Sequence, residues 1–110
     1  MTAIALEDES TELLASARSA RSGRAAQLVI GGPETTMTQT IIALRDGATL
    51  SEHHNPGEAS VLVLDGHVRL ITGGEHIDGT RGDLVPVPPE DHSLEARSDA
   101  VVLLTAVKLH

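Results

Sequence analysis

The sequence predicts an all-β sandwich or small barrel preceded by one helix. From Gln27 onward, short runs of aliphatic and β-branched residues alternate with turns such as GGPE, NPGE and PPED. About eight such runs follow one another without a helical interruption, a pattern typical of sandwiches and barrels. The interior must be built from Val, Leu, Ile, Ala and Met, because the chain contains no Phe, Tyr or Trp. We expect one helical arm, residues 1–26, and one barrel, residues 27–110.

The helix of the arm is expected to run from about Ser10 to Ser22, with Gly23 placed to end it. Leu13, Leu14 and Ala17 form a narrow apolar stripe along it. Acidic residues lie at its start and arginines at its end, an arrangement that suits the helix dipole. We interpret these arginines as a solvated helix terminus, and a contact with an anion or a membrane is the alternative.

Composition excludes several classes of partner. The chain has 8 Lys and Arg against 16 Asp and Glu, a net charge of −8, so it repels polyphosphate. It also has no aromatic ring on which a base could stack, so we expect no nucleic-acid partner. No run is long and apolar enough for a membrane span, and the acidic start MTAIALEDESTELL is unlike a signal peptide. For these two reasons we expect a cytoplasmic protein, and the absence of cysteine is compatible with that location.

Two of the predicted strands are apolar on both of their faces. These strands are SVLVL and AVVLLTAV, and each needs to be covered on both sides. One short helix offers less cover than they require, so we expect a homodimer, for which closed two-fold pairing is the commonest arrangement.

Two stretches of the barrel region share a spacing of glycine, proline and histidine. In GATLSEHHNPGEASVLVLDG, five residues separate Gly47 from His53, and Gly66 closes the stretch. In GDLVPVPPEDHSLEA, five residues separate Gly82 from Pro88, and a histidine follows. In order and spacing the two stretches resemble the two motifs of the cupin superfamily. The resemblance implies a small cupin barrel, a double-stranded β-helix of the jelly-roll type.

The same resemblance implies candidate metal ligands. Cupins usually hold a divalent ion with two His and one Glu from the first motif and one His from the second. The matching positions of this chain are His53, Asn55, Ala59 and His92. Two donors of the four remain, and His54 and Glu58 lie one residue before the expected second His and the Glu. The Asn-Pro-Gly turn could bend the strand enough for them to assist one divalent ion (Zn, Ni, Fe or Mn) at His53, His54 and His92.

Strand alternation predicts which side chains share a face. We expect His53 to share its face with Thr49 and Ser51. Gln39 would either face the interior and bind a ligand or be an ordinary outward residue, and the sequence leaves both open. The expected ligand-binding residues are therefore Gln39, His53, Asn55, Glu58 and His92.

The remaining histidines and the Gly-rich stretch have simpler interpretations. We expect His67, His76 and His110 to be exposed. The stretch GGEHIDGTRGD is acidic and does not open a helix, so we interpret it as a hairpin loop rather than a phosphate-binding loop.

Two functions remain open. The first is a small-molecule-binding cupin whose pocket is lined by His53, Asn55 and His92 inside an aliphatic barrel. The alternative is a metal-dependent enzyme of the dioxygenase, isomerase or decarboxylase type, which would act on a small organic substrate with a divalent ion at His53 and His92. The incomplete ligand set favours the first, because two imidazoles alone hold a divalent ion weakly.

Overall fold

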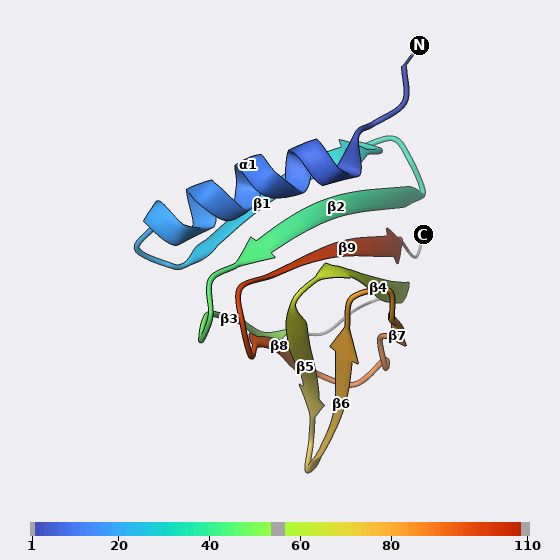
Figure 1. Cartoon of the computed structure of the whole chain (residues 1–110). Helices are drawn as coiled ribbons and strands as arrows, with labels where there is room; N and C mark the ends of the chain where they lie inside the picture. The colour runs from blue at the N-terminus through green and yellow to red at the C-terminus, as the bar shows by residue number, and fades with distance from the viewer. Residues whose placement is uncertain (1, 54–56, 109–110) are drawn as a thin grey trace.

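The computed structural model describes residues 2–53 and 57–108, and at residues 52 and 53 it describes the backbone (Figure 1). Within these residues the chain forms one helix and nine strands. In chain order they are α1 (Leu6–Ser19), β1 (Arg24–Ile30), β2 (Met37–Leu44), β3 (Thr49–His53), β4 (Glu58–Asp65), β5 (His67–Thr72), β6 (Glu75–Thr80), β7 (Leu84–Pro86), β8 (His92–Ala96) and β9 (Ala100–Val107). No helix in the described part of the chain is long and apolar enough to cross a membrane.

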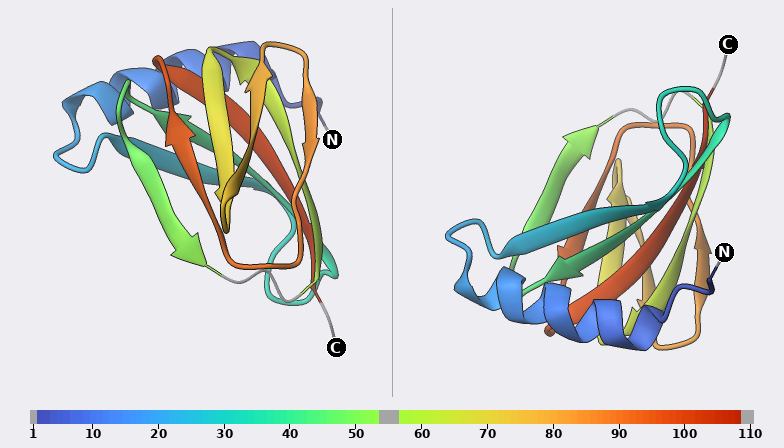
Figure 2. Two further views of the ribbon diagram at one scale, coloured as in Figure 1. Left: turned by 90° about the horizontal axis from the view of Figure 1, so that it is seen from below. Right: turned by 90° about the horizontal axis from the view of Figure 1, so that it is seen from above.

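The strands form two antiparallel sheets that face each other (Figure 2). The five-stranded sheet has the order β1-β2-β9-β4-β7, and the four-stranded sheet has the order β3-β8-β5-β6. The predicted all-β barrel with one N-terminal helix is therefore confirmed. β1 begins at Arg24, so this sheet includes the last three residues of the arm that we defined as residues 1–26.

The main core lies between the two sheets and is entirely aliphatic, as the composition predicted. Alternate residues of facing strands fill it, because successive side chains on a strand point to opposite faces. Its buried members are Ile42, Leu44, Val61, Val63, Val68, Leu70, Val85, Leu94, Ala96, Ala100 and Val102.

A second core lies on the outer face of the five-stranded sheet, under α1. Leu13 and Ala17 of the helix pack there against Ile41, Ala43 and Val101 of the two central strands. These strand residues alternate with those of the main core, so the helix covers the second apolar face that the sequence predicted for AVVLLTAV.

The helix begins earlier than predicted. It starts at Leu6, whereas the sequence favoured Ser10 as the first residue. Ala5 precedes it without a side-chain cap, and three consecutive acidic residues occupy its first turn. Carboxylates there stabilise the exposed N–H groups through the helix dipole, so the helix starts without the usual Ser or Asp cap.

The helix also ends three residues earlier than predicted, at Ser19. Ala20 adopts an extended conformation, with φ −78° and ψ 143°. Arg45, at the end of β2, donates from Nη1 to the carbonyl oxygens of Arg18, at 3.1 Å, and Ala20, at 3.2 Å. The guanidinium of a distant loop thus satisfies carbonyls at the helix terminus. Gly23, with φ 73°, forms the turn into β1 instead.

The prediction that GGEHIDGTRGD is a hairpin loop is wrong, because most of this stretch is strand β6. β6 pairs with β5 along its whole length, and Ile77 lies opposite Leu70 of the core. Only Gly73 and Gly74 form the turn between the two strands. Gly and Asp are poor strand formers, so tertiary pairing overrides local propensity here.

Candidate functional site

Among the residues whose burial the structure describes, His92 is the one buried polar side chain, and it lies within the aliphatic interior of the barrel. Only 4% of the residue is exposed. It begins β8 and alternates in phase with Leu94 and Ala96, both members of the main core. Its imidazole therefore lies between the sheets, at the end of the barrel where β8 starts.

The ring of His92 is held by the loop that precedes it. Its Nδ1 lies 2.9 Å from the carbonyl oxygen of Glu90. A carbonyl only accepts hydrogen bonds, so Nδ1 donates and carries the proton. In the neutral ring the lone pair is then on Nε2, the atom that can accept a hydrogen bond from a ligand or bind a metal. The loop is tied to β5 by Thr72, whose hydroxyl donates to the carbonyl oxygen of Asp91 at 3.1 Å.

The backbone pairing of β3 with β8 sets the Cα atom of His53 opposite that of His92. Leu50 pairs with Leu94, and the register then shifts before His53. Two residues of β3 but only one residue of β8 lie between these pairs, which is the arrangement of a β-bulge. The side chain of His53 lies outside what the structure describes, so the face that we predicted for it stays a prediction.

Glu58 and Ala59 are the first residues of β4. Ala59 alternates in phase with Val61 and Val63 of the main core, whereas Glu58 is exposed on the other face. The structure therefore brings Ala59, and not the carboxylate of Glu58, toward the interior. The predicted site residues His54 and Asn55 lie outside the described residues.

Gln39 lies on the outer face of the five-stranded sheet. It alternates in phase with Ile41 and Ala43, which pack under α1. Its Nε2 donates to Oγ1 of Thr105 on the neighbouring strand, at 3.0 Å. The sequence left open whether Gln39 faces the interior or points outward, and in the structure it points outward. Gln39 therefore does not lie near His92.

A groove of about 990 Å³ adjoins the loop that holds His92. One wall is the β5–β6 hairpin, and the other is the β7–β8 loop that carries Glu90 and Asp91. Ile71, Ile77 and Val87 supply apolar surface. Sequence analysis missed this groove because one wall was interpreted as a loop, and the one available signal was the proline-rich PVPPED beside His92.

Comparison with known proteins agrees with this geometry. Residues 40–108 match the family model described as "Cupin domain". The chain belongs to the cupin domain family. A search of curated proteins finds no match.

Solved cupin structures share the fold. A conserved protein of unknown function from Streptococcus pyogenes matches with a TM-score of 0.73 at 22% identity, over 83% of this chain and 79% of that one. A cupin superfamily protein from Desulfitobacterium hafniense matches with a TM-score of 0.71 at 21% identity, over 86% and 87% of the two chains. An RmlC-like cupin from Desulfovibrio desulfuricans has a TM-score of 0.67 at 24% identity, over 76% and 81%. At these identities the likeness is one of fold.

The described residues of this cupin fit a divalent metal only in part. Nδ1 of His92 contacts the carbonyl oxygen of Glu90, so Nε2 is the nitrogen that could bind a metal, and His53 lies opposite His92 along the backbone. Ala59 occupies the position that matches the family carboxylate and has no donor atom. Within residues 2–51 and 57–108, no three His, Asp or Glu side chains gather as a metal-binding group. An ion here would depend on His53, His92 and whatever the segment 54–56 adds.

His67 is not fully exposed, contrary to our expectation. It is half-buried at the start of β5, and its Nε2 is shielded from solvent 3.2 Å from Oδ2 of Asp78. The contact is close enough for attraction, although it does not meet hydrogen-bond geometry. Arg69 donates to both carboxylate oxygens of Asp78, and mainly for that reason the pKa of Asp78 lies well below its usual range. His76 is exposed, as expected, and His110 lies outside the described residues.

Proposed function

We propose that this cupin binds a small organic molecule inside the barrel at His92. The observation that carries the proposal is a buried imidazole, held through Nδ1 by the carbonyl oxygen of Glu90 and set among aliphatic side chains. A few polar atoms in an otherwise apolar cavity are the usual composition of a small-molecule site. His53, opposite His92 in the register, and Asn55 are the other residues that we assign to the pocket.

The chemistry of the surroundings narrows the ligand class. In a neutral ring, Nε2 of His92 is the nitrogen that can accept a hydrogen bond from a ligand donor, such as a hydroxyl or an ammonium group. Glu75, Glu90 and Asp91 line the adjoining groove and disfavour an anionic ligand. We therefore propose a neutral or cationic aliphatic molecule. A cytoplasmic location belongs to the same proposal and rests on composition alone.

Ligand-observed NMR with a panel of small aliphatic alcohols, amines and carboxylates tests this function. We expect saturation transfer to members of the alcohol or amine groups, and loss of that transfer in His92→Ala. His76→Ala is the matched control, because His76 lies on the groove wall and is exposed. Binding that survives in His92→Ala, or a panel in which only the carboxylates bind, would contradict the proposal.

Metal-assisted catalysis is the second candidate, and the contact of His92 Nδ1 with the carbonyl oxygen of Glu90 supports it. His53 and His92 would hold the ion, which would act as a Lewis acid toward an oxygen of the substrate. The Nδ1 contact with Glu90 would keep the His92 ring in the orientation needed for binding through Nε2. The missing carboxylate at Ala59 makes this the weaker of the two candidates.

A further inference from the structure

The outward direction of Gln39 turns its two neighbours in the chain toward the barrel interior. β2 pairs with β9 along its whole length without a register shift, so its side chains alternate strictly between the two faces. Thr38 and Thr40 are therefore in phase with Ile42 and Leu44 of the main core. Both threonines are half-buried, and in the described part of the chain neither hydroxyl has a hydrogen-bond partner. The inner face of β2 thus offers two hydroxyl groups.

Thr40 and His92 lie at the same depth from one end of the barrel. At that end the turn that follows β2 is joined to β8, because the N–H of Gly47 donates to the carbonyl oxygen of Ala96 at 2.9 Å. Thr40 is four residues before Leu44, the last residue of β2, and His92 is four residues before Ala96, the last residue of β8. Each therefore lies about 13 Å along its strand from that end. Since the two strands belong to facing sheets, the side chains of Thr40 and His92 lie across the interior from each other.

Small side chains line the interior beside these two residues. Thr38 is paired with Ala106 of β9, and Ala106 is paired in turn with Ala59 of β4. One step deeper on the same face lie the larger Leu104 and Val61. Alanine fills less volume than valine or leucine, so the interior is least filled toward the end of the barrel where His92 lies.

We propose that Thr40 contacts the ligand of the barrel site from the wall opposite His92, and that this ligand is a short aliphatic molecule with two polar groups, one of them a hydroxyl. The inference rests on the proposed function and adds a second point of attachment to it. A threonine hydroxyl donates and accepts, so it can pair with a ligand hydroxyl in either sense. Nε2 of His92 is then left for the other polar group. Two contacts on opposite walls select a ligand by the spacing of its polar groups, which one imidazole alone does not do.

NMR titration with matched pairs of probes tests this contact. Tetramethylene glycol has one hydroxyl more than n-butanol, and propanolamine has one hydroxyl more than n-propylamine. In the unmodified protein the probe with the additional hydroxyl should bind about fivefold more tightly, which is the effect of one hydrogen bond. Thr40→Val keeps the shape of the side chain without its hydroxyl, so it should abolish this preference. Thr40→Ser restores the hydroxyl and should retain most of it.

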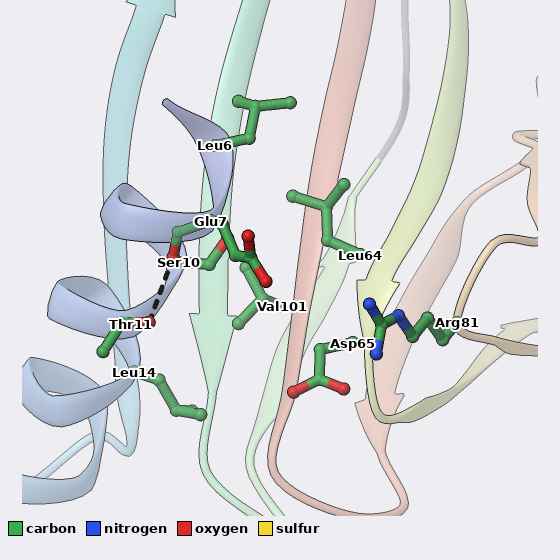
Figure 3. Close-up of a pocket in the computed structure, with 9 residues that line it drawn as sticks. All are labelled: Leu6, Glu7, Ser10, Thr11, Leu14, Leu64, Asp65, Arg81 and Val101. Carbon is green, nitrogen blue, oxygen red and sulfur yellow. Dashed lines mark hydrogen bonds between the residues drawn. The ribbon is translucent and has the colours of Figure 1, made fainter. Parts of the chain in front are cut away.

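A matched control removes a hydroxyl from a different hollow of the molecule. Thr11 lines a hollow of about 370 Å³ between α1 and β4, where its hydroxyl donates to the carbonyl oxygen of Glu7 at 3.0 Å (Figure 3). Asp65 and Arg81 supply further polar groups there, so this hollow is the alternative place for the same probes. Thr11→Val should leave the preference for the additional hydroxyl unchanged. Circular dichroism checks that all variants stay folded.

A zinc titration tests the position of Thr40 without an organic ligand. Thr40→His adds an imidazole to the inner face of β2, opposite His92, whereas Gln39→His adds one to the outer face one residue away. Thr40→His should bind Zn²⁺ about tenfold more tightly than Gln39→His, or more, because one ion can then contact the new imidazole and His92 together.

Three results would overturn the inference. One is a preference for the additional hydroxyl that persists in Thr40→Val while His92→Ala abolishes binding, a result that leaves the proposed function intact. Another is a preference that is lost in Thr11→Val and kept in Thr40→Val, which would move the ligand to the hollow beside α1. The third is a Thr40→His variant that binds Zn²⁺ no more tightly than Gln39→His. A panel in which no probe binds the unmodified protein contradicts the proposed function instead, and the zinc titration then decides whether Thr40 faces His92.

Discussion

His92 lies opposite His53 in the pairing of β8 with β3, and a one-residue register shift brings them together. Continued without the shift from the pair Leu50 and Leu94, the register would set Glu52 opposite His92. The bulge therefore decides which residue of β3 has its backbone opposite that of His92. Bulges of this kind are common beside functional sites because they re-aim one residue without disturbing the rest of the strand.

If a divalent ion binds at this end of the barrel, the histidines should differ in their contributions. His53→Ala and His92→Ala should each abolish binding, because each removes a direct bond to the ion. His54→Ala should weaken it only in part, since water can replace an assisting group, and His76→Ala should have no effect. Calorimetric titration of the four variants with Ni²⁺, Zn²⁺ and Fe²⁺ measures this. Tight binding retained in His53→Ala would overturn the assignment, and no binding to the unmodified protein would favour the metal-free ligand pocket.

The glycines of the motifs should respond to alanine in a graded way. Gly66 has φ 82°, and a Cβ there would overlap the carbonyl oxygen of Asp99 and lie 2.7 Å from Cα of Ala100. Gly66→Ala should therefore lower the free energy of unfolding by about 3 kcal/mol or more. Gly47, with φ 85°, has open space around it, so Gly47→Ala should cost only about 1–2 kcal/mol.

Gly74→Ala is the control for this series. Gly74 does not have a positive φ, and no atom lies within 4 Å of the place that an alanine methyl group would take, so its effect should stay within about 0.5 kcal/mol. Urea unfolding of the three variants gives the order. Equal losses of unfolding free energy in Gly66→Ala and Gly47→Ala would contradict this prediction. They would show that the positive φ, and not the contact with residues 99 and 100, sets the cost of the alanine.

Asp99 should be important for stability because it joins three parts of the fold. Its Oδ1 accepts from the backbone N–H of Asp46 at 2.8 Å, and its Oδ2 accepts from Nε of Arg18 in α1 at 2.7 Å. These contacts lower the pKa of Asp99, the Asp46 N–H most of all. Asp99→Ala should reduce the free energy of unfolding by about 1–2 kcal/mol. Chemical denaturation measures this loss. Asp46→Asn is the control, since it keeps the backbone N–H that donates to Asp99. A loss of unfolding free energy in Asp46→Asn comparable to that in Asp99→Ala would contradict the prediction.

The β5–β6 hairpin should weaken in acid. Arg69 lowers the pKa of Asp78 in the folded state, so the carboxylate stabilises the fold at any pH above its unfolded pKa of about 4. That stabilisation should decrease as pH falls below about 4 toward the lower folded pKa. The difference in unfolding free energy between the unmodified protein and Asp78→Asn should thus be full at neutral pH and smaller in acid. Glu75→Gln, on the same hairpin, is the control, and a difference that grows in acid would refute the prediction.

The sequence by itself determined the class of the fold and the positions of the motif glycines. Short aliphatic runs separated by turns predict strands that pair into sheets, and the glycine spacing around His53 and His92 placed two of those runs in order. Gly66 shows why the glycine spacing is informative. Its positive φ and the close approach of the backbone at residues 99 and 100 leave glycine as the one residue that fits at this position. The aliphatic core followed from composition alone.

Tertiary structure alone decided the details of the site. The bulge before His53, the outward face of Gln39 and the strand in GGEHIDGTRGD all depend on which strand lies next to which. Alternation along one strand fixes only relative faces, and one extra residue in a pairing reverses them. The end of α1 likewise depends on Arg45, which the chain brings back from 25 residues beyond Ala20. Local sequence patterns carry no information about a partner such as Arg45, because the free energy that selects it comes from contacts between segments far apart in the chain.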